Sequence, residues 1–163
     1  QVCRAPGLQA HGGMAVMKLS TKSRYGLRGM LHLALAEQGR SVMAREIAEE
    51  QNLPLTYLEQ LMLALKKAGL VMAIRGAHGG YMLARDASAI TLAQIVESLE
   101  GPLHVADCAD VPNCCKDPHV CALKDIFSEW NAALYEAFDR ITLADFASRH
   151  RLKLSASNPM YFI

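Results

Sequence analysis

REIAEEQNLPLTYLEQLMLALKKAGLV, residues 45–71, is the stretch that decides the fold. Apolar residues recur at helical spacing on both sides of Asn52-Leu53-Pro54, which predicts one helix over about 44–51 and another over about 55–68. Two short helices joined by a tight turn form a helix-turn-helix, whose second helix enters a DNA major groove. An ordinary helical hairpin gives the same pattern, so the flanking sequence has to separate the two.

Four side chains near the start of the second helix are predicted to face outward, and all are able to meet base edges or phosphates. They are Thr56, Tyr57, Glu59 and Gln60. Glutamine pairs bidentately with adenine, and glutamate accepts a hydrogen bond from cytosine N4. These residues are therefore the candidates for contact with DNA bases.

Residues 70–76 and 80–85 predict two strands joined by a glycine-rich turn. A hairpin directly after the recognition helix is the wing of a winged helix. Glycines 76, 79 and 80 let the backbone approach another surface closely, and Arg75 at the base of the turn suits a narrow minor groove. The alternative is a glycine-rich hairpin with an ion-pairing arginine.

Three further helices are predicted over about 20–37, 88–101 and 123–140, the first capped by Ser20. Four cations crowd the start of the first helix: Lys18, Lys22, Arg24 and Arg28. Cations disfavour a helix N-terminus, so we expect them to face phosphates, with a merely solvated helix end as the alternative. The third carries a long apolar stripe that is larger than a small winged helix needs to cover, which predicts a homodimer; packing against the chain's own first helix is the alternative.

The predicted fold class is mainly α: a winged helix-turn-helix domain with a small β-hairpin wing, plus a long dimerisation helix. We expect an upstream or tag-like extension over 1–16, the winged domain over 17–101 and a cysteine-rich loop over 102–122. The dimerisation helix and following segment would span 123–150, and a tail 151–163.

Composition narrows the class of protein. Of 163 residues, 52% are hydrophobic, which excludes a disordered chain, and no apolar run approaches a membrane span of about 18 residues. Residues 17–90 hold ten Lys and Arg against six Asp and Glu, a balance of +4, and residues 91–163 hold six against ten, a balance of −4. A basic front half suits a nucleic-acid-facing module, and the missing export signal suggests a cytoplasmic, reducing compartment.

Four of the five cysteines lie within fourteen residues: Cys108, Cys114, Cys115 and Cys121. In a reducing compartment such a group is more typical of metal binding or redox chemistry than of disulfides. Thiolates are soft ligands for iron–sulfur clusters. A thiol-based oxidant sensor and a zinc-stabilised interaction module are the alternatives, although adjacent cysteines rarely both bind one tetrahedral zinc.

Four stretches resemble the Rrf-two family of bacterial winged-helix transcription regulators, above all its iron–sulfur cluster regulators and cysteine-metabolism regulators: MKLSTKSRYGLRGMLHLA, YLEQLMLALKKAGLV, IRGAHGGYMLAR and ITLADF. The resemblance covers residues 17–149. It implies a dimer that reads operator DNA with the second helix and the wing. The residues that this assigns to DNA contact are Thr56, Tyr57, Glu59, Gln60, Arg75 and Gly76.

The resemblance also implies a 2Fe–2S cluster held by three cysteines and one other ligand. Cys108, Cys115 and Cys121 are the expected ligands, with Cys114 as the competitor to Cys115. Cluster regulators carry a histidine three residues after the last cysteine, where this chain has Lys124, and a second branch carries an acidic residue early in the first helix, where this chain has Arg24. The fourth ligand is therefore unassigned.

We expect a sequence-specific regulator that binds double-stranded operator DNA as a homodimer and senses iron–sulfur or redox status through the cluster. Clusters of this kind are easily lost in air. The alternatives are a cluster-free thiol-based redox or cysteine-metabolism repressor and, less favoured, the zinc-stabilised module. We find no nucleotide-binding loop in the sequence, and no grouping of serine, histidine and an acidic residue stands out. The sequence therefore gives little support for an enzyme. Neither a membrane nor a small-molecule substrate is expected.

Overall fold

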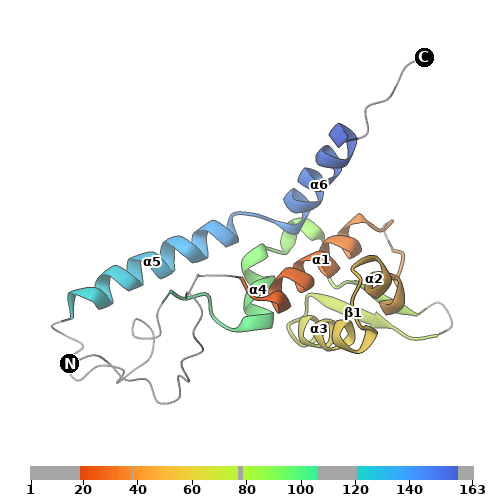
Figure 1. The fold of residues 1–163 in the computed structure, drawn as a ribbon, viewed down its shortest axis with the longest axis horizontal. Coiled ribbons are helices and arrows are strands. Elements are labelled where there is room, and N and C mark those ends of the chain that lie inside the picture. Colours follow the sequence, from red (N-terminus) through yellow and green to blue (C-terminus); the bar gives the residue numbers. More distant parts are fainter. Residues whose placement is uncertain (1–18, 38, 77–78, 106–120, 158–163) are drawn as a thin grey trace.

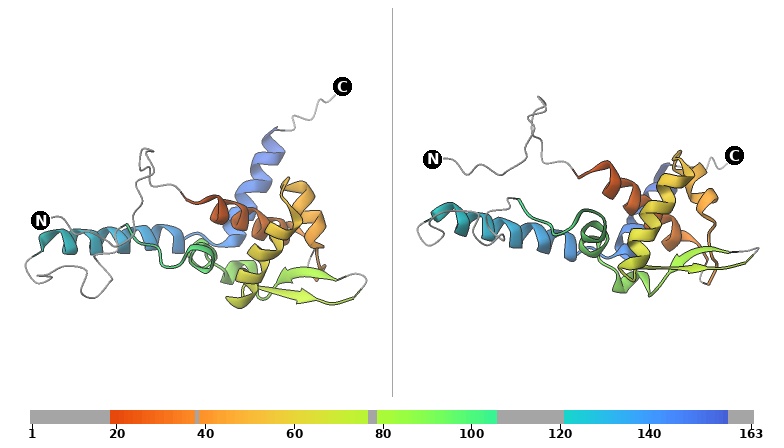
Figure 2. Two further views of the ribbon diagram at one scale, coloured as in Figure 1. Left: turned by 60° about the horizontal axis from the view of Figure 1, so that its bottom comes forward. Right: turned by 90° about the horizontal axis from the view of Figure 1, so that it is seen from below.

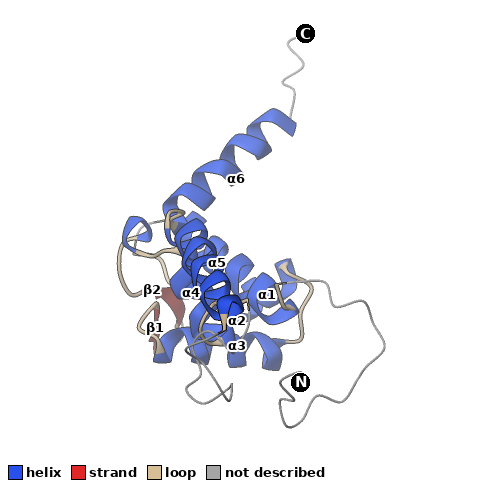
Figure 3. Ribbon diagram, turned by 90° about the vertical axis from the view of Figure 1, so that its left-hand side faces the viewer, coloured by secondary structure: helices blue, strands red, loops and turns tan. Residues whose placement is uncertain are grey.

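The computed structural model describes residues 19–37, 39–76, 79–105 and 121–157. Within them the chain forms a helical body with one antiparallel hairpin (Figures 1 and 3). In chain order the elements are α1 (Thr21–Leu35), α2 (Ala44–Glu50), α3 (Leu55–Lys67), β1 (Val71–Ile74), β2 (Gly80–Leu83), the 3-10 turn η1 (Ala87–Ala89), α4 (Leu92–Glu100), α5 (Ala122–Asp139) and α6 (Leu143–Ser157). No helix in these ranges is long and apolar enough to cross a membrane.

The predicted helix-turn-helix is present, with α2 and α3 ending and beginning within two residues of the predicted positions. Asn52 reverses the chain with a φ of 52°, in the left-handed region that asparagine tolerates better than most residues. The Leu53 N–H donates to the Ala48 carbonyl over 2.8 Å, which closes the turn. Pro54 then caps α3, where the missing N–H of proline costs no helical hydrogen bond.

A single apolar core holds α1, α2, α3, α4 and the start of α6 together. Its fully buried large side chains come from all of these elements and from the segments between them: Met30, Val42, Ile47, Leu58, Leu61, Met62, Leu65, Leu70, Ile90, Ile95, Val96 and Leu143. The inward faces that the periodicity predicted for the two short helices are confirmed.

The wing is a two-stranded hairpin with Val71 paired to Leu83 and Ile74 paired to Gly80. It projects from the body at the end opposite to the start of α5 (Figure 2). An isolated bridge attaches it to the body, because the Tyr81 N–H donates to the Val42 carbonyl over 2.8 Å and the Val42 N–H donates back over 2.9 Å. The wing therefore has a fixed root.

Two short repeats, Ile90–Ile95 (ITLAQI) and Ile141–Phe146 (ITLADF), start α4 and α6 in the same way. In each, the threonine hydroxyl accepts from the backbone N–H three residues on, and the side chain there accepts from the threonine N–H. The two threonines, Thr91 and Thr142, also form an antiparallel bridge. Both helices thus begin at one paired point.

The predicted start of the helix before the cysteine segment was wrong. The fourth predicted helix, over about 88–101, begins at Leu92, because Ser88 lies in the 3-10 turn and donates to Asp86 over 2.8 Å. The capping box of Thr91 is what starts the helix.

The last part of the chain also differs from the prediction. We expected a tail from residue 151, but α6 runs on to Ser157. Its second half leaves the body, and α5 extends away in another direction with much of its length clear of the body (Figure 1).

Candidate nucleic-acid interface and cysteine segment

The start of α3 presents a polar edge to solvent. Thr56, Glu59 and Gln60 are exposed, as predicted. Tyr57 is not: it is half-buried and its ring meets that of Tyr25 edge-on, with the centroids 6.4 Å apart. The prediction that Tyr57 points outward is therefore wrong in part, because an aromatic residue on α1 covers it.

Tyr25 was not singled out from the sequence, yet it joins α1 to the recognition helix. The Arg28 guanidinium carbon lies 5.9 Å from the centroid of the Tyr25 ring, close enough for a cation–π contact. Contacts thus run from Arg28 through Tyr25 on α1 to Tyr57 on α3. The available sequence signal was the tyrosine three residues before an arginine on one helix face.

Glu59 also faces the wing. Burial and, after it, the charge of Glu59 raise the pKa of Tyr81 above its usual value. Tyr81 lies in β2 beside the Val42 bridge. The carboxylate that we expect to read bases therefore lies near enough to Tyr81 of the wing to act on it, and α3 packs against β1.

At the tip of the wing, Arg75 and Gly76 are exposed directly after β1. Gly76 has a φ of 117°, which favours glycine. The close approach predicted for the other glycines is made within the chain itself: a Cβ on Gly79 would lie 2.5 Å from the Ile74 carbonyl oxygen, and one on Gly80 would overlap the Val42 carbonyl. These two glycines therefore shape the hairpin, and Gly76 is the one left free to approach another molecule.

The cations of α1 have different surroundings, although we expected all of them to face phosphates. Lys22 donates through Nζ to the Leu99 carbonyl at the end of α4, so it holds the fold together. Arg24 donates to the Thr21 hydroxyl over 3.1 Å and stays exposed, as does Arg28. Lys18 lies outside the described residues.

The contact of Lys22 belongs to a junction between the start of α1 and the end of α4. The Ser20 N–H donates to Glu100 Oε1 over 3.2 Å. Partial burial raises the pKa of Glu100, but hydrogen bonds from Ser20 and the charge of Lys22 outweigh it, so the pKa lies below its usual value. The cysteine-rich segment begins directly after this junction.

Of the cysteines in that segment, the structure describes Cys121. It is a half-buried free thiol and forms the N-cap position of α5. Cys108, Cys114 and Cys115 lie outside the described residues. The Lys124 N–H donates to the Cys121 carbonyl, which places Lys124 in the first turn of the helix beside this candidate ligand.

The surroundings of Cys121 suit a cluster ligand. Cys121 offers a soft donor at a partly sheltered helix start, and three more thiols precede it within thirteen residues. Lys124 is cationic and supplies no such donor, so a fourth ligand has to come from elsewhere.

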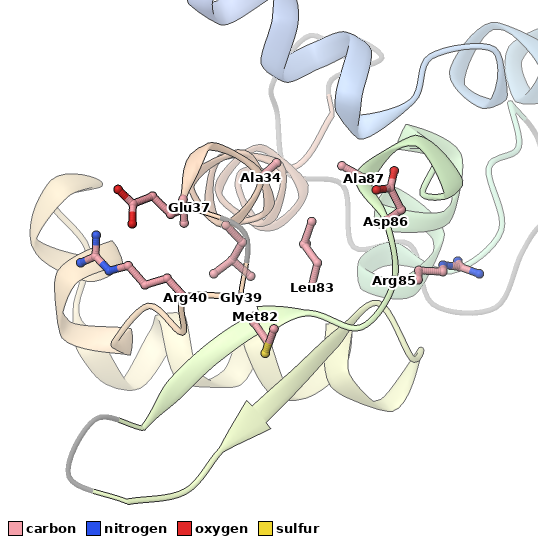
Figure 4. Close-up of a pocket in the computed structure, with 11 residues that line it drawn as sticks. Ala34, Glu37, Gly39, Arg40, Met82, Leu83, Arg85, Asp86 and Ala87 are labelled. Atoms are coloured by element: carbon pink, nitrogen blue, oxygen red, sulfur yellow. The ribbon is translucent and has the colours of Figure 1, made fainter.

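A separate cavity of about 200 Å³ lies between the end of α1 and the root of the wing. Leu83 points into it, whereas the charged ends of Glu37, Arg40 and Arg85 point outward (Figure 4). Arg40 and Arg85 also have partners already, in Glu46 and Gln94. Polar groups do not converge there, unlike in most ligand sites.

The chain matches the model of the Rrf2 family, described as an iron-dependent transcriptional regulator, over residues 19–149. It is 38% identical over 129 residues to the protein rrf2 of Nitratidesulfovibrio vulgaris, covering 79% of this chain and 86% of that one. The structure of CymR, the global cysteine regulator of B. subtilis, superimposes with a TM-score of 0.68 at 38% identity, over 82% of this chain and 98% of that one. The structure of T. potens IscR gives 0.65 at 34% identity, over 93% and 96%.

These solved structures confirm the mainly helical winged-helix fold. The chain belongs to the Rrf2 family of transcriptional regulators.

Proposed function

We propose that this protein is a homodimeric, sequence-specific DNA-binding regulator whose grip on its operator depends on a 2Fe–2S cluster held by the cysteine segment. The single observation that carries the DNA-binding part is the exposure of Glu59 and Gln60 on α3, which packs against β1 of the wing, with Arg75 exposed directly after that strand. That arrangement offers base-reading groups to a major groove and a cation to the adjacent minor groove.

Glu59 is the most informative residue for specificity. A carboxylate accepts from cytosine N4 but repels the acceptor atoms of other bases, so it restricts the choice of sequence. Glu59→Ala should relax discrimination at one position by about 1–3 kcal/mol while leaving binding to the best site nearly intact. Binding site selection on a random duplex library measures this, and equal weakening on all sequences would refute the base-reading role.

The dimer is supported by the apolar face of α5, which the described residues of one chain leave uncovered. Leu123, Ile126 and Trp130 are 57%, 40% and 54% exposed. The groove between α1 and α6, about 340 Å³ and bordered by Arg24 and Arg28, offers cations to the acidic side of a second α5. Trp130→Ala should weaken self-association in sedimentation experiments, whereas Ala132→Ser on the polar side of α5 should not.

Coupling between the cluster and DNA follows from the junction of α1 with α4. The segment that holds the cysteines starts after Glu100, whose carboxylate and preceding carbonyl contact the first turn of α1. A change in this segment therefore reaches α1, which carries the Tyr25–Tyr57 contact to the recognition helix. In a dimer, half-sites lie about 34 Å apart, so a small shift of each recognition helix is enough to lower affinity.

The test is operator affinity of one anaerobic preparation before and after cluster removal, with iron and acid-labile sulfide assayed on each sample. A coupling of about 1–3 kcal/mol predicts a change in Kd of roughly 5–150-fold. Equal affinities would refute the coupling, and a protein that takes up no iron and sulfide would refute the cluster. Single replacements of Cys108, Cys115 and Cys121, with Cys114 in parallel, would then identify the ligands.

A cluster-free thiol sensor is the second candidate, and Lys124 is the observation that favours it. It stands in the first turn of α5, where the cluster-regulator pattern has a histidine ligand. Similarity to a cysteine regulator supports the same candidate. In that case the iron assay is negative, and DNA affinity changes instead when the thiols are oxidised and recovers with a reductant.

A further inference from the structure

The second half of α6, residues 149–157, leaves the body that the first half helps to build. Leu143 and Ala147 are buried where the first half packs against α1 and η1. Leu154 lies on the same side of the helix, at further steps of three and four residues through His150, yet it is 55% exposed. Leu152, on the opposite side, is 69% exposed. The outer half of α6, as we call residues 149–157, thus presents a leucine that the described residues of one chain leave uncovered.

The outer half of α6 is also cationic. It carries Arg149, Arg151 and Lys153 and no acidic residue, whereas α5 carries one lysine against four acidic residues, a balance of −3. Arg149 is close enough to Asp145 of the same helix to lower the pKa of that carboxyl, so the other two cations are the ones that the outer half offers to a partner. The two helices are therefore complementary in charge.

The apolar face of α5 has its carboxylates in a suitable place. Asp125 and Glu129 are exposed, lie one turn apart, and follow one side of the exposed face formed by Leu123, Ile126 and Trp130. Within one chain α5 and α6 leave the body in different directions (Figure 1). A second copy is therefore the source of an α5 that could cover the outer half of α6.

The groove between α1 and α6 leads directly to this surface. Phe146 of α6 lines the groove together with Arg24 and Arg28 of α1, and it precedes the outer half by less than one turn. The 18 residues of α5 extend about 27 Å, against about 22 Å for the 15 residues of α6, at 1.5 Å per residue. One partner helix is long enough to lie in the groove and to continue along the outer half.

Two other occupants fit less well. A second copy of the outer half would bring like charges together, which association disfavours. Nucleic acid would meet the cations but would leave Leu154 uncovered, and α6 leaves the body on the side away from the recognition helix α3 (Figures 1 and 3). An acidic helix with an apolar face matches both properties of the surface.

We propose that the outer half of α6 is a docking surface for α5 of a second copy of this chain. Leu154 covers part of the partner's apolar face, and the cations beside it meet the carboxylates that follow that face. This inference rests on the proposed function, since the partner is the second subunit of the same dimer. It adds a contact that the apolar face of α5 does not by itself require.

The central test compares Leu154→Ala with Leu152→Ala, the same substitution two residues away on the opposite side of the helix. Both leucines are exposed in one chain, so neither change should disturb folding, and circular dichroism checks the helix content. Sedimentation of a dilution series measures the Kd of the dimer. Leu154→Ala should raise this Kd about tenfold or more, because a twofold dimer contains the contact twice, and Leu152→Ala should leave it unchanged.

A second variant tests the charges. Arg151→Glu combined with Lys153→Glu should also raise the dimer Kd, and this loss should shrink as salt is added, because salt screens exposed charges. The effect of Leu154→Ala should persist in high salt. Trp130 is the single tryptophan of the chain, so its fluorescence should move to shorter wavelength with the same midpoint as dimer formation.

The outcomes separate this proposal from the proposed function. Equal dimer Kd values for Leu154→Ala and Leu152→Ala would overturn the docking surface, while a dimer weakened by Trp130→Ala would still stand. If the charge-reversed variant dimerises normally but binds nonspecific DNA less tightly, the outer half is a nucleic-acid surface and the proposal is overturned. An unmodified protein that stays monomeric at every concentration would overturn the dimer and the docking surface together.

Discussion

Gly29 lies where α1 packs against Met62 of the recognition helix, and its replacement by alanine tests how tightly the two helices are packed. A Cβ there would lie 2.7 Å from Met62 Cε, against about 3.5–4.0 Å for a favourable carbon contact. Met62 is fully buried in the core, so its methyl group has little room to move. Overpacking of this kind costs about 1–3 kcal/mol, whereas glycine to alanine inside a helix gains about 1 kcal/mol. Gly29→Ala should therefore lower the free energy of unfolding by roughly 0–2 kcal/mol.

The sign of the effect should depend on Met62. Met62→Leu removes the Cε atom at a cost below about 1.5 kcal/mol, so in that background the helical gain of about 1 kcal/mol remains without the clash. Urea unfolding at one fixed protein concentration, for the four combinations, gives the coupling energy directly. If Gly29→Ala stabilises both backgrounds equally, then the packing of α1 on α3 is not limited by this contact and the reasoning is refuted.

Three other predictions follow from the fold and one from the interface. Asn52→Ala should lower the free energy of unfolding by about 1 kcal/mol because of its positive φ, whereas Asn52→Gly should change it by only a few tenths in the same urea assay. Thr142→Ala removes the cap of α6 and should cost about 0.5–2 kcal/mol by thermal or urea unfolding. Hydrogen bonds from the Thr142 hydroxyl and N–H hold the pKa of Asp145 below its usual value. The contribution of Asp145 to the free energy of unfolding is therefore fully present above the unfolded pKa and is lost as pH falls through the folded pKa. In unfolding experiments at a series of pH values, the stability of the unmodified protein should fall more steeply below about pH 4 than that of Asp145→Asn. Arg75→Ala should weaken DNA binding about tenfold and reduce the slope of log affinity against log salt by about one, and an unchanged slope in a salt titration would contradict a role at the DNA backbone or groove.

Local signals were enough to predict the helix-turn-helix and the wing. Apolar spacing of 3.6 residues, the Asn52–Pro54 break and the glycines of the hairpin each act within a few residues of the element they define. The same is true of the exposed edge of α3, because outward positions on a helix follow from the inward ones. Thr56, Glu59 and Gln60 therefore face solvent as predicted.

What failed depended on contacts between distant parts of the chain. The covering of Tyr57 needs Tyr25, thirty-two residues earlier, and the engagement of Lys22 needs a carbonyl at the end of α4. The burial of Asn131 is a consequence of Val105 lying against α5, which no periodicity on the helix itself reveals. In the alternation of the α5 sequence, Asn131 simply interrupts an apolar stripe.

Two helix boundaries were predicted wrongly, and a short motif marked only the first of them, the start of α4. The Thr-x-x-Gln and Thr-x-x-Asp patterns at Thr91 and Thr142 are recognisable cap signals, and the first would have placed the start of α4 correctly. The end of α6 had no such signal. Its last turns lie outside the body and are exposed on all sides, so they carry no apolar period to follow.

The pairing of Thr91 with Thr142 bears on which changes in chain length the fold can tolerate during evolution. The chain from α4 through the cysteine segment to α5 begins at Thr91 and ends at Thr142, and these two residues are paired with each other. Insertions and deletions in the cysteine segment therefore leave the paired starts of α4 and α6 in place. Such an arrangement lets the length of this part of the chain change in evolution while the pairing that closes it is kept.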